Sequence, residues 1–259
     1  MRKLLILFAL FLSTPLLAAG HLERVGRSGE LRICIWPDYF GISWRDPRTQ
    51  LLSGLDVDLA RELARELGAK PRFVDSSFAR LVDDLNQDRC DVAMFAIGIL
   101  PQRAERLAFT QPYLKSDIYA VTTRSNRRIR HWSDIDQPGV VVAVARGTLH
   151  EPVMRERLRQ ATLLVTDTPA GREQEVESGR ADVFMTDYPF SRRMLGLTDW
   201  ARLVAPPAPY HLTSYAWAVA QGDEPWRLRL DAFVTSIKRD GRLEAAARRY
   251  QLDSILVRD

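Results

Sequence analysis

Two charged side chains, each placed just after an apolar run, are the best candidates for chemistry in this chain. Arg103 follows the run at 92–99, and Pro101 between them suits the first position of a helix. Asp187 follows a second apolar run that ends at Thr186. A guanidinium matches a carboxylate in two hydrogen bonds, so Arg103 is a candidate anion clamp and Asp187 would present the opposite charge. The residues alone also allow Arg103 to be a surface arginine and Asp187 a helix cap.

The segments that carry Arg103 alternate between strand and helix patterns. Strand-like apolar runs lie at 31–36, 72–75 and 91–99, and helical stripes lie at 55–67 and 78–85. This βαβαβ order predicts a parallel sheet with helices on its faces. Ligands of open α/β sheets collect beyond the carboxyl ends of the strands, which is where Arg103 would lie.

The same pattern starts again in the second half of the chain. Strand-like runs at 140–144, 163–166 and 182–186 alternate with helical segments. The stretch LNQDRCDVAMFA (85–96) is echoed by EVESGRADVFMTD (175–187). Such an echo is what two similar α/β lobes would produce.

Extended segments at 112–124 and 215–220 would cross between the lobes, and helices at 226–237 and 243–250 would end the chain. The predicted fold class is therefore α/β, with two parallel-sheet lobes joined by a hinge. We expect residues 22–116 and 222–259 to form lobe 1. Residues 117–221, with both crossing segments, would form lobe 2.

The N-terminus has the pattern of a secretory signal peptide, residues 1–19. Arg2 and Lys3 precede an apolar core at 4–12, and cleavage is expected after Ala19, although Leu17 departs from the usual small residue. No later run of about 20 apolar residues follows, so we expect an exported, soluble protein. Without Arg2 and Lys3 the formal charge falls from +4 to +2. Because basic and acidic residues are interspersed, no nucleic-acid partner is expected.

The two cysteines, Cys34 and Cys90, each lie beside or within a predicted strand. In an oxidising compartment they could form a disulfide, or they could be buried separately, and the sequence leaves both alternatives open. Two cysteines without clustered histidines do not make a zinc site. We therefore expect no metal and no cofactor.

Six stretches, in order along the chain, carry a family pattern. They are residues 31–36, GLDVDLARELARELG (54–68), CDVAMFAIGILPQRAERLAFTQPYL (90–114), VAVARGTLHE (142–151), GRADVFMTDY (179–188) and IKRDGRLEAAARRYQL (237–252). Together they resemble the family 3 extracytoplasmic solute-binding proteins, the periplasmic receptors that deliver polar amino acids to ABC importers. The resemblance covers essentially the whole mature chain. It implies two lobes that close on a ligand at the hinge, with the C-terminal helices completing the first lobe.

The resemblance also implies roles for the charged residues. In that family an arginine in the matching segment binds the ligand α-carboxylate, which implies this role for Arg103. An aspartate that ends a strand of the second lobe binds the α-ammonium, which implies this role for Asp187. A Gly-Thr turn at a helix start adds carboxylate bonds and matches Gly147 and Thr148, where free amides favour an anion.

The pocket wall departs from the family pattern. The family threonine three residues before the arginine is Leu100 here, and the usual glycine before the anion loop is Ala96. The pocket should therefore be more apolar than a receptor for lysine or glutamate needs, and an organic acid or an apolar or aromatic amino acid fits as well. The expected wall residues are Tyr39, Phe40, Ala96, Ile97 and Gly98.

Two other functions remain alternatives to transport. Some relatives on this fold are cyclohexadienyl dehydratases, whose elimination chemistry needs a general acid, and His150, Glu151 and Glu173 are candidates by location. A soluble receptor that feeds a membrane sensor would use the same closure. The expectation is a binding protein rather than an enzyme, monomeric and periplasmic, with an ABC permease or a membrane sensor as its partner.

Overall fold

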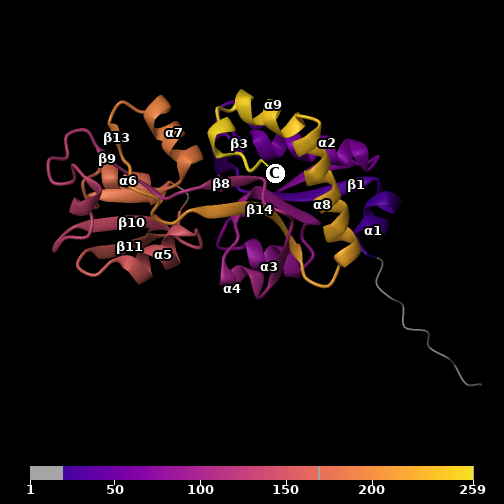
Figure 1. The fold of residues 1–259 in the computed structure, drawn as a ribbon, viewed down its shortest axis with the longest axis horizontal. Helices are drawn as coiled ribbons and strands as arrows, with labels where there is room; N and C mark the ends of the chain where they lie inside the picture. Colours follow the sequence, from indigo (N-terminus) through magenta and orange to yellow (C-terminus); the bar gives the residue numbers. More distant parts are fainter. Residues whose placement is uncertain (1–19, 169, 259) are drawn as a thin grey trace, which may run out of the picture.

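The chain folds into two α/β lobes that lie side by side and are joined by extended segments (Figure 1). The computed structural model describes residues 20–168 and 170–258. The predicted signal peptide at 1–19 lies outside the described residues. No described helix combines the length and the apolar character that a membrane crossing requires.

The first lobe is built on a mixed sheet. Its strand order is β5 (Lys70–Asp75), β1 (Glu30–Ile35), β6 (Val92–Gly98), β14 (Thr213–Ala220) and β7 (Leu107–Phe109), and β8 (Leu114–Ser116) also pairs with β14. The strands β5, β1 and β6 are parallel, whereas β14 runs antiparallel to β6. All residues of β6 are buried, as expected for an apolar run at the centre of a sheet. The returning strand β14, which the sequence analysis counted with lobe 2, pairs with this first sheet.

The second lobe repeats the design with a smaller sheet. Its order is β11 (Thr162–Thr166), β10 (Val141–Ala145), β12 (Val183–Thr186), β9 (Tyr119–Thr123) and β13 (Ala201–Val204). Here β11, β10 and β12 are parallel, and β9 runs antiparallel to β12. Each sheet thus has three parallel strands beside antiparallel ones. The strand periodicity predicts the parallel strands, because these follow the βαβ pattern.

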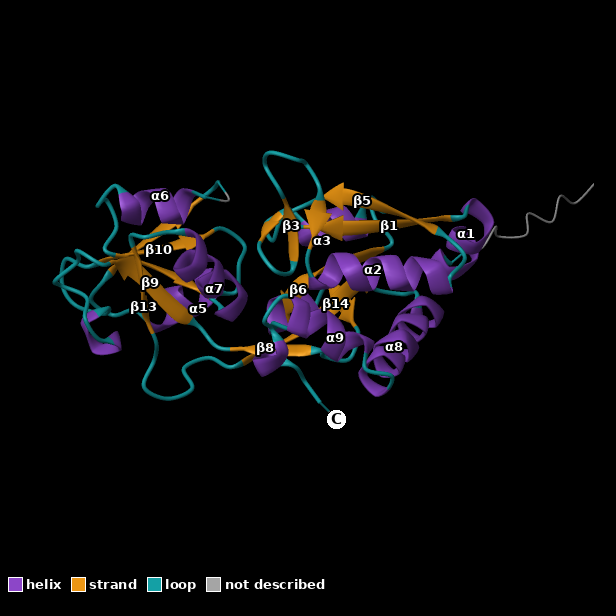
Figure 2. Cartoon of the chain, turned by 90° about the horizontal axis from the view of Figure 1, so that it is seen from above, coloured by secondary structure: helices purple, strands orange, loops and turns teal. Residues whose placement is uncertain are grey.

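Helices cover both sheets (Figure 2). Those of the first lobe are α1 (His21–Ser28), α2 (Leu55–Glu66), α3 (Leu81–Asn86), α4 (Pro101–Ala104), α8 (Glu224–Arg239) and α9 (Arg242–Arg249). Those of the second are α5 (His150–Arg157), α6 (Gly171–Glu177) and α7 (Tyr188–Leu197). A small sheet of β2 (Asp38–Tyr39), β3 (Ser43–Arg45) and β4 (Leu52–Ser53) precedes α2, and 3₁₀ turns lie at Trp132–Asp134 and Asp253–Ile255. The C-terminal helices α8 and α9 pack with α1 and α2 on the first lobe.

Cys34 in β1 and Cys90, just before β6, form a disulfide. Their Cα atoms lie 5.6 Å apart because the two strands are parallel neighbours. The structure therefore shows the bonded form, one of the two alternatives that the sequence left open. The bond closes a long loop, with a sequence separation of 56 residues, and so restricts the unfolded chain.

A buried carboxylate holds the strands of the first lobe together. Asp56, in the first turn of α2, accepts hydrogen bonds from the Ala96 amide (2.9 Å), the Tyr113 hydroxyl (2.6 Å) and the Trp217 indole (2.9 Å). These donors come from β6, the segment before β8, and β14. Burial raises the pKa of Asp56 to about 6, although the three hydrogen bonds favour its charged form.

The raised pKa makes a prediction about stability. The folded protein keeps the Asp56 proton at a higher pH than the unfolded chain does, so the stabilisation from this group is present below the ordinary carboxyl pKa and is lost as the pH rises through about 6. Asp56→Asn removes this effect. From pH 4 to pH 7, wild-type unfolding free energy should fall relative to the variant by on the order of 2 to 3 kcal/mol. Urea unfolding at both pH values measures it, and a pH-independent difference would contradict the assignment.

Candidate functional site

Arg103 lies buried at the boundary between the lobes. It is 7% exposed, and its position on the short helix α4 follows the carboxyl end of β6. Nη1 donates to the Gly98 carbonyl of its own lobe at 2.9 Å, and Nη2 donates to the Gly147 carbonyl of the other lobe at 2.8 Å. The guanidinium carbon lies 5.3 Å from the centre of the Phe78 ring. Burial lowers the pKa of Arg103 to about 10, so the side chain stays charged at neutral pH.

Arg103 therefore carries a positive charge whose acceptors are neutral. Among the described residues, none of its hydrogen bonds or ion pairs involves a carboxylate. Hydrogen bonds between a guanidinium and a carboxylate are about twice as strong as neutral ones and form in parallel pairs. The position is thus suited to an incoming carboxylate, and the interpretation as a surface arginine is wrong.

Asp187 lies on the opposite side of this boundary, at the end of β12. One carboxylate oxygen accepts from the Phe190 amide at 3.3 Å and so caps α7. The other accepts from the hydroxyls of Tyr215, at 3.0 Å, and of Tyr39, which reaches across from the first lobe. Burial raises the pKa of Asp187. The helix-cap role and the position facing the other lobe are therefore both present in one side chain.

The turn at Gly147 and Thr148 begins α5 and meets the first lobe. Gly147 has φ 74°, and a Cβ atom there would lie 2.6 Å from the Ala79 Cα, so only glycine fits. Its amide donates to the Glu151 carboxylate at 2.8 Å, and the Thr148 hydroxyl donates to the Ala145 carbonyl at 2.7 Å. In this structure the group of the turn that meets Arg103 is therefore the Gly147 carbonyl, and anion binding by its amides stays a prediction.

A small cavity lies between the lobes beside these groups. Its volume is about 10 Å³, which is room for a single water molecule, so the lobes are closed against each other. Phe78 is at the centre of its aromatic wall, with ring centres 5.2 Å from Trp36 and 6.0 Å from Tyr39. The lining residues are Trp36, Tyr39, Phe78, Ala96, Thr148, Leu149, His150, Arg172, Thr186, Asp187 and Phe190.

The remaining expected wall residues have different positions. Phe40 packs edge-on against Trp44, with ring centres 5.3 Å apart, and borders a surface groove instead of this cavity. Ile97 is buried within the first sheet, where it pairs with Ala216. Gly98 contributes through the carbonyl that accepts from Arg103. The structure thus brings only part of the expected wall to the cavity.

Several cavity residues were not expected from the sequence. The helical stripe at 78–85 predicts Phe78 in a helix, but α3 begins only at Leu81. The Phe78 ring lies against the Arg103 guanidinium. Thr186 adjoins Asp187, so its place at a strand end was the available signal. Arg172 lies at a helix start, and nothing in its local sequence distinguishes it. Tyr215, which binds Asp187 from β14 without lining the cavity, was not expected either. His150, named above as a candidate acid, does line the cavity.

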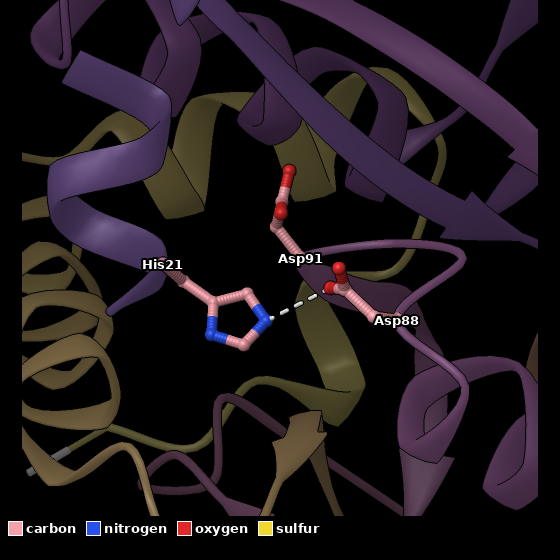
Figure 3. Close-up of side chains that lie close together, drawn as sticks. All are labelled: His21, Asp88 and Asp91. Atoms are coloured by element: carbon pink, nitrogen blue, oxygen red, sulfur yellow. Dashed lines mark ion pairs between the residues drawn. The ribbon is translucent and has the colours of Figure 1, made fainter. Parts of the chain in front are cut away.

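A second polar cluster lies in the first lobe, between α1 and the residues that precede β6 (Figure 3). His21, Asp88 and Asp91 have ligand atoms within 4.8 Å of one another, which is close enough for a metal ion. Arg24 and Arg32 already bind both carboxylates, and Arg32 lies 2.7 Å from Asp88 and 2.8 Å from Asp91. Two guanidinium groups repel a cation, so we interpret the cluster as an ion-pair network that fastens α1 to the sheet.

A closed pair of α/β lobes with opposite buried charges at their boundary is the architecture of a hinged ligand-binding protein. The model of the bacterial extracellular solute-binding proteins, family 3, matches residues 31–253, and the chain belongs to this family. The crystal structure of the ancestral amino acid-binding protein AncCDT-1, a precursor of cyclohexadienyl dehydratase, has a TM-score of 0.81 and 28% identity, covering 88% of this chain and 98% of that one.

Curated relatives include both binding proteins and an enzyme. Cyclohexadienyl dehydratase of Pseudomonas aeruginosa is 32% identical over 225 residues, which are 86% of this chain and 83% of that protein. L-cystine-binding protein TcyJ of Escherichia coli is 23% identical over 231 residues, or 89% and 86% of the two chains. Amino-acid-binding protein AabA of Dichelobacter nodosus is 26% identical over 223 residues, or 83% and 85%.

The bond between Tyr39 and Asp187 predicts how the lobes stay closed. Tyr39→Phe removes a hydroxyl donor from a buried carboxylate across the lobe boundary. Hydrogen bonds to charged groups contribute about 1.5 to 3 kcal/mol, so the open form should gain about 10- to 100-fold in relative population. Small-angle X-ray scattering should then show a larger radius of gyration. Tyr119→Phe on β9 is the control, and an equal response of both variants would refute the role of Tyr39.

Proposed function

We propose that this protein is a periplasmic receptor that captures an amino acid or a related small carboxylate between its lobes and delivers it to an ABC importer. The observation that carries the proposal is the buried charge of Arg103, which meets two carbonyls and an aromatic ring at the lobe boundary. A buried cation gains most from a charged acceptor, because the low local dielectric strengthens their attraction.

Binding would exchange internal contacts for contacts with the ligand. A carboxylate between the lobes would replace the Gly147 carbonyl on Arg103 and offer two oxygens instead of one. Asp187 would accept hydrogen bonds from a ligand ammonium in place of the Tyr39 hydroxyl. A ligand that bridges the lobes stabilises the closed form only through contacts that it makes there.

One side of the cavity wall is aromatic and suits the carbon skeleton of a ligand. Trp36, Tyr39 and Phe78 form one wall, and Phe190 contributes from the second lobe. Leu100, in place of the family threonine, is buried and offers no hydroxyl to the carboxylate. These side chains can contact the apolar part of an organic acid or of an aromatic amino acid.

Removing the guanidinium tests the proposal. Arg103→Met should lower the affinity for any carboxylate ligand by about 100-fold or more, because the ligand loses its main charge partner. Isothermal titration calorimetry measures the change. Arg106→Met is the matched control, since Arg106 is exposed and pairs with Asp83 outside the cavity. An unchanged dissociation constant in Arg103→Met would rule out the assigned role.

A dehydratase is the second candidate function. It is favoured by the 32% identity to the Pseudomonas aeruginosa enzyme over 86% of this chain. One of the acid candidates is buried in the structure, because Glu173 is 9% exposed; its Oε1 pairs with Arg172, and its Oε2 has no hydrogen-bond partner in the described chain. The other acid candidate, Glu151, is engaged with the Gly147 amide. Glu173 borders the neighbouring groove rather than the central cavity, so we rank binding above catalysis.

Product analysis separates the two functions. In a thermal-shift screen of amino acids, aromatic acids, dicarboxylates and prephenate, a ligand at about 100 times its dissociation constant should add about 2.7 kcal/mol of stability. The receptor proposal predicts that every stabilising compound is recovered unchanged after incubation, as judged by chromatography. Conversion of prephenate to a new product would establish the enzyme instead.

A further inference from the structure

Arg172 is a second buried cation, and it belongs to the second lobe. It lies at the start of α6 and is 2% exposed. Nε donates to Glu173 at 2.8 Å and Nη1 donates to the Met185 carbonyl at 3.0 Å. The guanidinium carbon is 4.3 Å from the centre of the Phe190 ring and 5.3 Å from that of Phe184. The group is therefore held in one orientation by contacts on three sides.

The held guanidinium forms part of the central cavity wall. Arg172 makes hydrogen bonds through Nε and Nη1. Its Nη2 has no acceptor within the described chain. Arg172 is ion-paired with the Glu173 carboxylate, and its charge adds to the burial that lowers the pKa of His150 on the same wall. A fixed arginine with a remaining donor beside a cavity is suited to binding an anion.

Polar atoms without partners lie on the same wall. The Thr186 hydroxyl is fully buried and makes no hydrogen bond within the described residues. His150 Nδ1 lies 3.3 Å from Thr148 Oγ1, whose own proton goes to the Ala145 carbonyl. His150 Nε2 is likewise buried and makes no hydrogen bond within the described residues. Such buried atoms cost stability unless a bound molecule satisfies them.

We propose that Arg172 and Thr186 form a second anion-binding subsite and that the ligand is a small dicarboxylic acid, with one carboxylate on Arg103 and the other on Arg172. This inference rests on the proposed function and specifies its ligand class. The Arg172 guanidinium and the Thr186 hydroxyl supply donors for the second carboxylate. Asp187 supplies an acceptor for an amino or hydroxyl group on the carbon chain between them, and His150 lies on the same cavity wall.

Matched ligand pairs test the inference by calorimetry. The probes are glutarate against its monoamide, and L-glutamate against L-glutamine, because each pair differs in one charged group. Wild-type protein should bind each diacid about tenfold or more tightly than its partner. Arg172→Met should abolish that preference, because it should lower the affinity for the diacids more than the affinity for the monoacids. Arg193→Met is the control, since Arg193 contacts the Phe190 ring but lines different grooves.

A second variant guards against loss of folding. Thr186→Val keeps the shape of the side chain and should lower diacid affinity alone, by a smaller factor than Arg172→Met. Equal wild-type affinity for diacid and monoamide, or an equal loss of both in the variants, would overturn the subsite. Binding of no amino acid or carboxylate, or binding unaffected by Arg103→Met, would instead overturn the proposed function itself.

Discussion

A buried arginine needs acceptors, and this requirement organises the boundary between the two lobes. Arg103 takes one carbonyl from each lobe, Gly98 and Gly147, so both protein acceptors are in place only when the lobes are closed. Asp187 carries the opposite charge and accepts hydrogen bonds from the hydroxyls of Tyr39 and Tyr215. Both charges are thus satisfied by neutral groups, which a charged ligand can replace at a gain in electrostatic energy.

The precision of this boundary depends on the first lobe behind it. Asp56 binds the amide of Ala96, a cavity residue with φ 47°, and connects it to Trp217 on β14. A non-glycine residue in the left-handed region costs about 1 to 3 kcal/mol and persists only when its surroundings fix it. The buried carboxylate and the Cys34–Cys90 bond supply that support. The lobe can therefore present Arg103 at a fixed place.

Much of the fold was predictable because its elements obey simple periodicities. The buried strand β6 and the amphipathic helix α2 appear within a residue or two of their expected bounds. The strand β13 was missed, since its mixed sequence has no clear period and it gains its structure from pairing with β9. The helix α7 was anticipated only through Asp187 as its possible cap, which the structure confirms. Helix α1 was missed because it follows the predicted signal peptide directly.

The candidate site was predictable only where charge and chain position coincide. Arg103 and Asp187 each follow a buried strand, which places them at a sheet edge. Phe78 and Arg172 meet at the cavity, and Tyr215 meets Asp187, only through the relative position of the two lobes, which local sequence patterns do not reveal. Phe40 shows the reverse, because β2 ends at its neighbour Tyr39, which lines the cavity, and Phe40 in the following turn borders the surface groove.

The most direct test of the account is a crystal structure with a bound carboxylate ligand. The account predicts a carboxylate paired with the Arg103 guanidinium, with the Gly147 carbonyl no longer its acceptor and both lobes in contact with the ligand. A carboxylate bound elsewhere, with the bond from Arg103 to Gly147 intact, would contradict it.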